Sequence, residues 1–442
     1  MESGVKKAKL KLSTIVFMMY VFIAGGAYGI EDMIGEAGPG MTILLLLLLP
    51  VVWGLPFGLI SAELSARYPQ EGGIYVWVKK ALGRFWGFQT GWSFTLCTIV
   101  DTAVYLVLAV GYLEWAIGIE LTPVQSWLIC IGLSVVFGVL NVRGIEALGF
   151  SSIVFVIITL LPFLAATVLG LGQLQFNPVK PFIPEGETVF GSLSTAILIG
   201  MWMYSGYETM STFGDEVEDA KSLIPKALLW VMPIVALSYI IPTLVGLGVV
   251  GNWGDWSTDG PVSFIEMGAI IGGKALGFGF LISAVVSNLS IYSGYLASCA
   301  RIPFVMAKDK LFFKSFTKVH PKYGTPYIAI MVSTVIIAIC CYGSFEALIV
   351  IDMFLYLIPL ALMFISAAIL RFRESPQDGA YRIPVGNKMF LFIAAVPTLI
   401  ALYALFADEP VYWIAGGLTA LTGVPAYFIF NKVYNKKTAA VK

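Results

Sequence analysis

Charged side chains are scarce in this sequence. Asp, Glu, Lys and Arg together make up 12% of the 442 residues, whereas a soluble domain carries about 25%. Hydrophobic residues make up 58%, which is more apolar surface than a soluble fold can bury but which a lipid bilayer can accommodate. This composition excludes a soluble enzyme, a disordered scaffold and a secreted disulfide-rich domain.

Residues for catalysis and metal binding are also few. There is one histidine, His320, so no Ser-His-Asp triad or metal site can be assembled, and we find no phosphate loop. We therefore expect no enzyme activity, metal or cofactor. The 27 basic residues balance 27 acidic ones, which leaves no net charge to attract nucleic acid. The five cysteines all lie in apolar runs, and we expect small buried side chains rather than disulfides at Cys97, Cys130, Cys299, Cys340 and Cys341.

Long apolar segments recur along the whole chain. Each is about 20 residues long or longer, which is enough to span a bilayer. We predict an all-α integral membrane protein with twelve transmembrane helices and short loops, at 12–35, 40–66, 84–113, 124–141, 149–172, 189–212, 227–250, 275–305, 326–342, 345–370, 389–407 and 410–431. Twelve spans place both ends of the chain on the same side.

The basic residues indicate which side this is. All 27 Lys and Arg residues except Lys180 and Lys274 fall on the side of the N-terminus when the chain is threaded through twelve spans. Positive charge is concentrated in cytoplasmic loops of membrane proteins. We therefore expect a multi-pass protein of the cell membrane with both termini in the cytoplasm.

Two of the predicted spans contain sequences that disfavour a continuous helix. The first span holds three glycines within Gly25–Gly29, and each costs about 1 kcal/mol relative to Ala inside a helix. The sixth holds Gly206 flanked by polar groups, within Trp202–Glu208. Non-helical backbone at mid-membrane depth is tolerated only where it faces protein or a watery cavity.

The two breaks fall at similar depths in spans one and six. This spacing predicts two five-helix repeats, 12–172 and 189–371, between a cytoplasmic segment at 1–11 and two further helices at 388–431 with a tail at 432–442. Broken helices in corresponding positions are typical of inverted-repeat transporters, where half-helix ends bind the substrate at mid-membrane. The alternative is that the glycines only permit close helix packing.

Four stretches, 25–40, 56–92, 202–228 and 301–312, resemble the amino acid–polyamine–organocation (APC) superfamily of secondary transporters. The first two, together with Asp101–Tyr105, resemble most the polyamine-uptake and L-type amino acid transporter branch, whose motifs are shared with amino-acid carriers. The resemblance implies the LeuT-like fold of two inverted five-helix repeats. It also implies alternating access, with the substrate held between helices 1, 3, 6, 8 and 10.

Three carboxylates, Asp101, Glu208 and Asp352, fall inside predicted spans, where each costs about 2.5–3.5 kcal/mol to insert. The resemblance implies that Asp101 faces the substrate and that Glu208 gates and titrates. Two carboxylates around one cavity suit a substrate with two cationic ends, although a helix-packing hydrogen bond is the alternative for each. Asp352 has no counterpart that we can place, and we favour a structural role for it.

Aromatic residues complete the predicted site. The resemblance places Trp202 over the substrate, and tyrosines near the breaks can stack on a cation or an aliphatic chain. The predicted substrate-binding residues are Gly25, Gly26, Ala27, Tyr28, Gly29, Asp101, Trp202, Ser205, Gly206, Tyr207, Glu208 and Tyr295. Gating or proton coupling is assigned to Trp202, Glu208, Asp101 and Glu31. For Glu31, an outer vestibule and the capping of a half-helix are both open.

The coupling ion is less directly indicated. Proton-coupled amino-acid carriers of the superfamily often have a lysine in helix five, but 149–172 contains none. Protonation of Glu208 or Asp101 is one route, and sodium held by the break in span one with Ser287 or Ser290 is another. We predict a secondary transporter, monomeric or homodimeric, that moves polyamines or other cationic amines or amino acids and is driven by protons rather than sodium. A proton-coupled neutral amino-acid transporter or an amino-acid exchanger is the alternative, and two broken helices with an aromatic gate argue against a channel.

Overall fold

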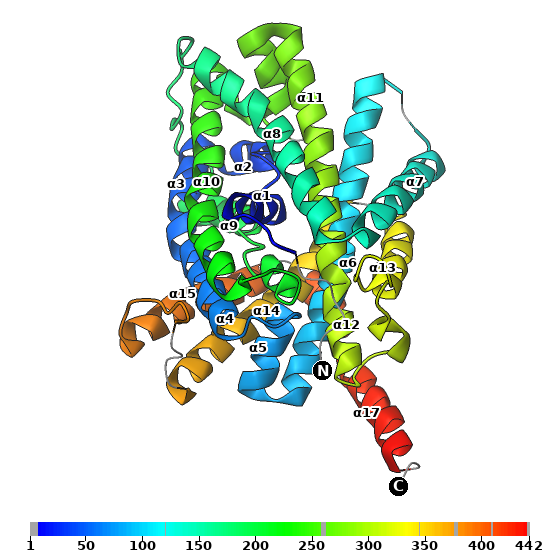
Figure 1. Ribbon diagram of the computed structural model, residues 1–442. Helices are drawn as coiled ribbons and strands as arrows, with labels where there is room; N and C mark the ends of the chain where they lie inside the picture. Colours follow the sequence, from blue (N-terminus) through cyan, green and yellow to red (C-terminus); the bar gives the residue numbers. More distant parts are fainter. Residues whose placement is uncertain are drawn as a thin grey trace.

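The computed structural model describes residues 8–119, 121–257, 262–343, 345–374, 379–407 and 410–439, and these residues are almost entirely helical (Figure 1). The helices are α1 (Leu12–Ile23), α2 (Ile30–Ala37), α3 (Pro39–Leu49), α4 (Leu55–Arg67), α5 (Gly73–Leu82), α6 (Arg84–Ile117), α7 (Pro123–Val142), α8 (Ile145–Gly170), α9 (Val189–Met203), α10 (Ala220–Val249), α11 (Phe264–Cys299), α12 (Arg301–Lys308), α13 (Tyr327–Cys340), α14 (Phe345–Arg373), α15 (Asn387–Ala407), α16 (Pro410–Leu421) and α17 (Gly423–Ala439). Short helical turns are η1 (Pro50–Gly54), η2 (Thr209–Phe213), η3 (Trp253–Asp255) and η4 (Lys314–Thr317).

Within these ranges, β structure is limited to two isolated bridges. The predicted all-α class is therefore confirmed. Residues 1–7 of the predicted cytoplasmic segment and residues 440–442 of the predicted tail lie outside the described residues.

Seven helices of the described chain are long and apolar enough to cross a membrane. They are Pro39–Arg67, Arg84–Glu114, Pro123–Val142, Ile145–Gly170, Ala220–Val249, Phe264–Lys308 and Phe354–Arg373. Three shorter apolar helices, Leu12–Ile23, Tyr327–Cys340 and Asn387–Tyr403, accompany them. Each of the ten coincides with a predicted span. The count of twelve stays a prediction, because several predicted spans are divided into shorter helices.

The outer helices expose apolar side chains that water would not favour. On α8, the side chains of Phe150, Leu161, Leu164 and Val168 are between 62% and 72% exposed. Apolar surface costs about 25 cal/mol for each Å² left in water, and the acyl chains of a bilayer remove this cost. The chain is therefore a multi-pass membrane protein.

Two helices, α5 and α11, differ from the predicted spans. Helix α5 was not predicted, because ten residues are too few for a membrane span, yet it buries Tyr75 and Trp77 while Lys80 stays at the surface. Helix α11 begins at Phe264 rather than near residue 275, and its backbone leaves helical geometry at Gly272 and Gly273. The predicted start of the eighth span thus corresponds to the segment after this kink.

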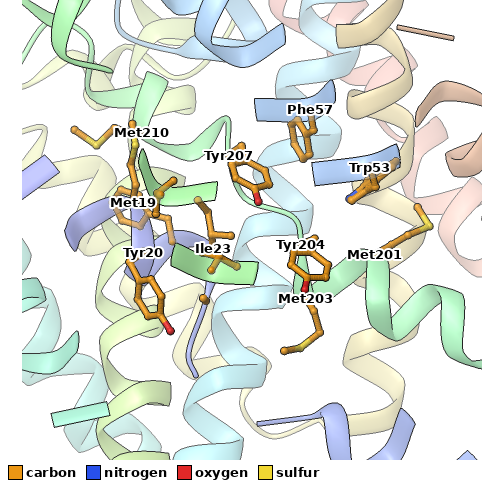
Figure 2. Close-up of a cluster of buried hydrophobic side chains, with 14 of the residues drawn as sticks. Met19, Tyr20, Ile23, Trp53, Phe57, Met201, Met203, Tyr204, Tyr207 and Met210 are labelled. Atoms are coloured by element: carbon orange, nitrogen blue, oxygen red, sulfur yellow. The ribbon is translucent and has the colours of Figure 1, made fainter. Parts of the chain in front are cut away.

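The middle of the molecule is built from the broken helices. Figure 1 shows α1, α2 and α9 enclosed among longer helices such as α8 and α10. In Figure 2, buried Tyr204 and Tyr207 lie between Ile23 of α1 and the Trp53 and Phe57 side chains. The rings of Phe57 and Tyr207 are 5.5 Å apart between their centroids.

Both described ends of the chain lie at one end of the molecule. The backbone N–H of Ala8 donates to the carbonyl of Glu216 at 2.8 Å, and the hydroxyl of Tyr434 on α17 donates to the carbonyl of Phe312 at 2.7 Å. We name this the ion-paired end, because it holds the pairs Arg301–Glu216, Lys308–Glu71 and Arg371–Glu63. An even number of membrane crossings, as predicted, would bring the two ends of the chain together in this way.

Candidate functional site

The first break separates α1 from α2. Ala24 is extended, with φ −138° and ψ 133°, and Gly26 and Gly29 adopt φ values of 83° and 96°. This left-handed region is accessible to glycine at little cost. The predicted loss of helical geometry at Gly25–Gly29 is confirmed.

The second break follows α9, where Tyr204 has φ −108° and ψ 35°. Gly206 has a φ of 94°, and a Cβ atom there would overlap the carbonyl oxygen of Phe22 in the last turn of α1. The break predicted near Ser205–Gly206 is therefore confirmed. The two broken helices touch at Gly206, where only a glycine fits.

Several side chains bind the backbone groups that the breaks release from helical hydrogen bonding. The Tyr295 hydroxyl donates to the carbonyl of Phe22 at 3.0 Å, and the Ser287 hydroxyl donates to the carbonyl of Gly25. Trp53 donates from Nε1 to the Ser205 hydroxyl at 3.2 Å. Among the described hydrogen bonds, none uses the backbone N–H groups of Ala27 and Tyr28. These two N–H groups are free to donate hydrogen bonds to an anionic ligand.

Three buried carboxylates lie beside the second break. Asp101 on α6, Glu208 after Gly206, and Asp352 on α14 are 6%, 1% and 3% exposed. Asp101 lies within electrostatic range of both other carboxylates. No Lys or Arg of the described chain forms an ion pair with any of the three. The site therefore concentrates negative charge without a resident cation.

Two polar side chains each bind one of these carboxylates, Asp352 and Glu208. The thiol of Cys97 donates to Oδ1 of Asp352 at 3.0 Å. The hydroxyl of Tyr356 donates to Oε1 of Glu208 at 3.2 Å and accepts the backbone N–H of Gly206 at 3.1 Å. Helices α6 and α14 thus approach each other at the site, and α14 is bonded to the break after α9.

An aromatic group covers Asp101. The ring of Trp202 stacks on Tyr105, with centroids 6.0 Å apart and planes 14° apart. The Tyr105 ring also lies 5.8 Å from that of Tyr295. A Cβ atom on Gly29 would lie 3.5 Å from the Trp202 ring. Trp202 therefore fills the space between the first break and α6, and Tyr295 joins the same group.

Two of the predicted tyrosines lie elsewhere. The hydroxyl of Tyr28 donates to the carbonyl of Phe280 at 2.8 Å, and its ring packs 5.1 Å from Phe163. Tyr207 packs on Phe57 of α4. Both rings pack against other aromatic side chains, and their stacking on a substrate stays a prediction. Each lies next to a glycine with positive φ, and periodicity in the sequence does not reveal where such a turn directs its neighbour.

The structure favours one of the two alternatives left open for Glu31, the capping of a half-helix. Its carboxylate accepts the backbone N–H of Gly29 at 2.7 Å and that of Phe264 at 3.2 Å. Gly29 precedes α2 and Phe264 begins α11, so Glu31 caps two helix N-termini at once. A carboxylate is stabilised there by the helix dipoles. An outer vestibule is not its position, and a gating role for Glu31 stays a prediction.

Sequence reasoning missed three residues of this site, Cys97, Tyr105 and Tyr356, and it named Asp352 without assigning it to the site. The hydrogen bond from Cys97 agrees with the structural role favoured for Asp352, which stays a prediction, and the Asp352 carboxylate also lies within electrostatic range of Asp101. Residues four apart share a helix face, and Cys97, Asp101 and Tyr105 follow this spacing, as do Asp352 and Tyr356. This pattern of polar residues within apolar spans is the signal that could have found them.

Comparison with known proteins shows the family of this chain. The family model described as amino acid permease matches residues 10–429. The chain belongs to the amino acid permease family. This family is part of the APC superfamily, so the predicted resemblance is confirmed, and its members are transporters rather than enzymes.

Three relatives illustrate the similarity of this permease to characterised carriers. A polyamine transporter of Oryza sativa subsp. japonica is 31% identical over 92% of this chain and 76% of its own. A probable polyamine transporter of Arabidopsis thaliana is 30% identical over 89% of this chain and 78% of its own. A serine/threonine exchanger of Bacillus subtilis is 26% identical over 98% of each chain.

A small cavity adjoins the first break of the permease. Its lining consists of Tyr20, Val21, Ala24, Gly25, Val156, Thr159, Ser287 and Ser290. The hydroxyl of Ser290 is buried there without a hydrogen-bond partner. Helix α8 contributes Val156 and Thr159. The lining includes hydroxyl groups but no charged side chain. Ser287 and Ser290, which we named for a sodium site, both line this cavity. The lining residues include no lysine.

Outside the spans, Glu71 lies in the loop between α4 and α5 at the ion-paired end. Its side chain is buried, with Oε2 3.4 Å from Nζ of Lys308, while Oε1 has no partner. Burial, together with the negative charge of Glu216, raises the pKa of Glu71 to about 8. The positive charges of Lys308 and Arg301 lower the pKa of Glu71, but their effects are smaller than that of burial. Glu71 therefore titrates near neutral pH.

Proposed function

We propose that this permease moves polyamines or other cationic amines across the cell membrane by alternating access, with both termini in the cytoplasm. The observation that carries the proposal is the group of three buried carboxylates, Asp101, Glu208 and Asp352, which has no basic partner in the described chain.

A buried charge without a partner is strongly destabilising, by about 3–5 kcal/mol where one partner of a pair is removed. Such a charge must be neutralised by a proton or by a cationic ligand. An organic dication can satisfy two carboxylates while it is bound. Protons can replace it after it leaves, which is why we propose coupling to a proton gradient rather than a sodium gradient.

The relatives support an amine substrate. Two of them are named polyamine transporters, and each is at least 30% identical over most of this chain. The contact at Gly206 supports alternating access, because it joins the broken helices of the two proposed repeats, 12–172 and 189–371. Movement of one repeat relative to the other would open the site to each side in turn.

Amino-acid transport is the second candidate. The backbone N–H groups of Ala27 and Tyr28 are without partners in the described structure, and such groups beside a helix N-terminus bind carboxylates. The serine/threonine exchanger matches this chain over its full length. A zwitterion could then use these N–H groups for its carboxylate and Asp101 for its amine.

Binding measurements on charge-neutral variants distinguish the two candidates. We expect Asp101→Asn and Glu208→Gln to remain folded and to lose affinity for a diamine such as putrescine by about tenfold or more. The control is Asp255→Asn, because the Asp255 side chain is exposed and forms no hydrogen bond or ion pair in the described structure. Calorimetry with putrescine and with serine on each purified variant provides the test. Unchanged putrescine affinity in both site variants, with serine binding retained, would replace the amine proposal by the amino-acid one.

A further inference from the structure

Asp352 is a carboxylate that a two-ended amine site does not need. It is 3% exposed, and its single hydrogen bond in the described structure comes from the thiol of Cys97 to Oδ1. A thiol is a weak donor. The second oxygen, Oδ2, accepts no hydrogen bond from the described chain. A buried carboxylate with a free oxygen and no cation calls for a ligand.

The order of the three carboxylates follows from the directions of two helices. Helix α6 begins at the ion-paired end, where Arg84 donates to the carbonyl of Asp309 at 3.1 Å. Helix α14 finishes at that same end, where Arg371 pairs with Glu63. The two helices are therefore antiparallel. Toward the ion-paired end, residue numbers fall along α6 and rise along α14.

The hydrogen bonds of Cys97 and Tyr356 show the order of the three carboxylates along α6 and α14. Cys97 is one turn nearer the ion-paired end than Asp101, and it binds Asp352. Tyr356 is one turn nearer that end than Asp352, and it binds Glu208. The carboxylates are thus arranged in the order Asp101, Asp352, Glu208, with steps of about one helical turn, ~5 Å. Asp352 occupies the middle position.

We propose that Asp352 is a third cation subsite, which makes this permease select linear polyamines with an internal ammonium over diamines of the same length. The inference rests on the proposed amine transport. The terminal ammonium groups of a triamine would pair with Asp101 and Glu208. Its secondary ammonium would donate to the free Oδ2 of Asp352, while Cys97 holds Oδ1.

Two amines that differ at one position test this directly. Spermidine and 1,8-diaminooctane have the same number of chain atoms between their terminal nitrogens, but the diamine has a methylene group in place of the internal ammonium. Calorimetry on the purified full-length protein should give spermidine the higher affinity, by about tenfold or more. Asp352→Asn should remove this preference by weakening spermidine binding alone, and Asp352→Glu should restore part of it.

The controls distinguish the third cation subsite from the proposed amine transport on which it rests. Asp352→Ser serves as a second variant if Asp352→Asn does not fold, and Asp255→Asn should keep the wild-type preference. If both amines bind but Asp352→Asn and Asp352→Ser keep the wild-type preference for spermidine, the third subsite is refuted while amine transport stands. If folded wild-type protein binds neither amine, both proposals are overturned.

Discussion

The hydroxyl of Tyr356 lies 3.2 Å from Oε1 of Glu208 and accepts the backbone N–H of Gly206 at 3.1 Å. A single side chain on α14 therefore orients a buried carboxylate and also binds the unwound backbone beside it. The protonation state of Glu208 and the backbone conformation at Gly206 are therefore connected through the Tyr356 hydroxyl. A ligand that binds Glu208 would compete for the same oxygen atoms.

Removing this hydroxyl should affect both groups. We expect Tyr356→Phe to destabilise the protein by about 1–3 kcal/mol, because Glu208 and the Gly206 N–H each lose a buried partner. Amine affinity should fall as well, which calorimetry can measure beside a thermal unfolding curve. Tyr342→Phe is the matched control, since the Tyr342 side chain is exposed and its hydroxyl makes no hydrogen bond in the described structure. Equal effects of the two substitutions would contradict the role given to Tyr356.

Gly206 should tolerate no side chain. Its φ of 94° is strained for other residues, and a Cβ would overlap the Phe22 carbonyl. We expect Gly206→Ala to cost about 1–3 kcal/mol or more and to reduce uptake into proteoliposomes. Gly111→Ala is the control, because space is open around Gly111 on α6 and alanine favours a helix by about 1 kcal/mol. A Gly206→Ala protein as stable and active as the control would show that the two breaks do not need this contact.

The buried ion pair Arg301–Glu216 should contribute more to stability than a partly exposed ion pair. Arg301 and Glu216 are both almost fully buried, with Nε and Oε1 2.5 Å apart. Arg301→Met should cost about 3–5 kcal/mol, because it leaves the Glu216 charge uncompensated. Adding Glu216→Gln should recover part of this loss. By comparison, Lys79→Met, at the partly exposed pair with Asp309, should cost at most about 1 kcal/mol. Chemical or thermal unfolding in detergent gives the stability loss of all three variants. Similar losses for Arg301→Met and Lys79→Met would show that the buried pair is no more important than the partly exposed one.

Glu71 should make stability depend on pH. Its pKa in the folded protein is about 8, above the ordinary value of 4.5, so the folded state binds the proton more tightly than the unfolded state. Between these two values the folded state holds more protons, and the free energy of unfolding therefore falls as pH rises. We expect Glu71→Gln to flatten this part of the melting-temperature profile by the equivalent of ~1 kcal/mol or more. Glu187→Gln, at an exposed position, should leave the profile unchanged. Parallel profiles for wild type and Glu71→Gln would contradict the burial argument.

Features that depend on local sequence were predictable. The spans follow from the length of apolar runs, so ten apolar helices of the described chain coincide with predicted segments. Helix α5 was missed because it is amphipathic and too short for that criterion. Both breaks follow from the cost of glycine in a helix and from polar groups at membrane depth. They appear where predicted, at Gly25–Gly29 and near Gly206.

The site was predictable only in part. The sequence alone determined that Asp101 and Glu208 lie in apolar spans without a nearby basic residue, because burial of a charge has a large cost whatever the fold. It could not place Asp352 with them, since that depends on α14 packing antiparallel to α6, about 250 residues away in the chain. Tertiary structure also decided that Glu31 caps two helices and that Tyr28 and Tyr207 turn away. Side-chain direction after a left-handed glycine, and contact between distant helices, are set by packing, which no local pattern encodes.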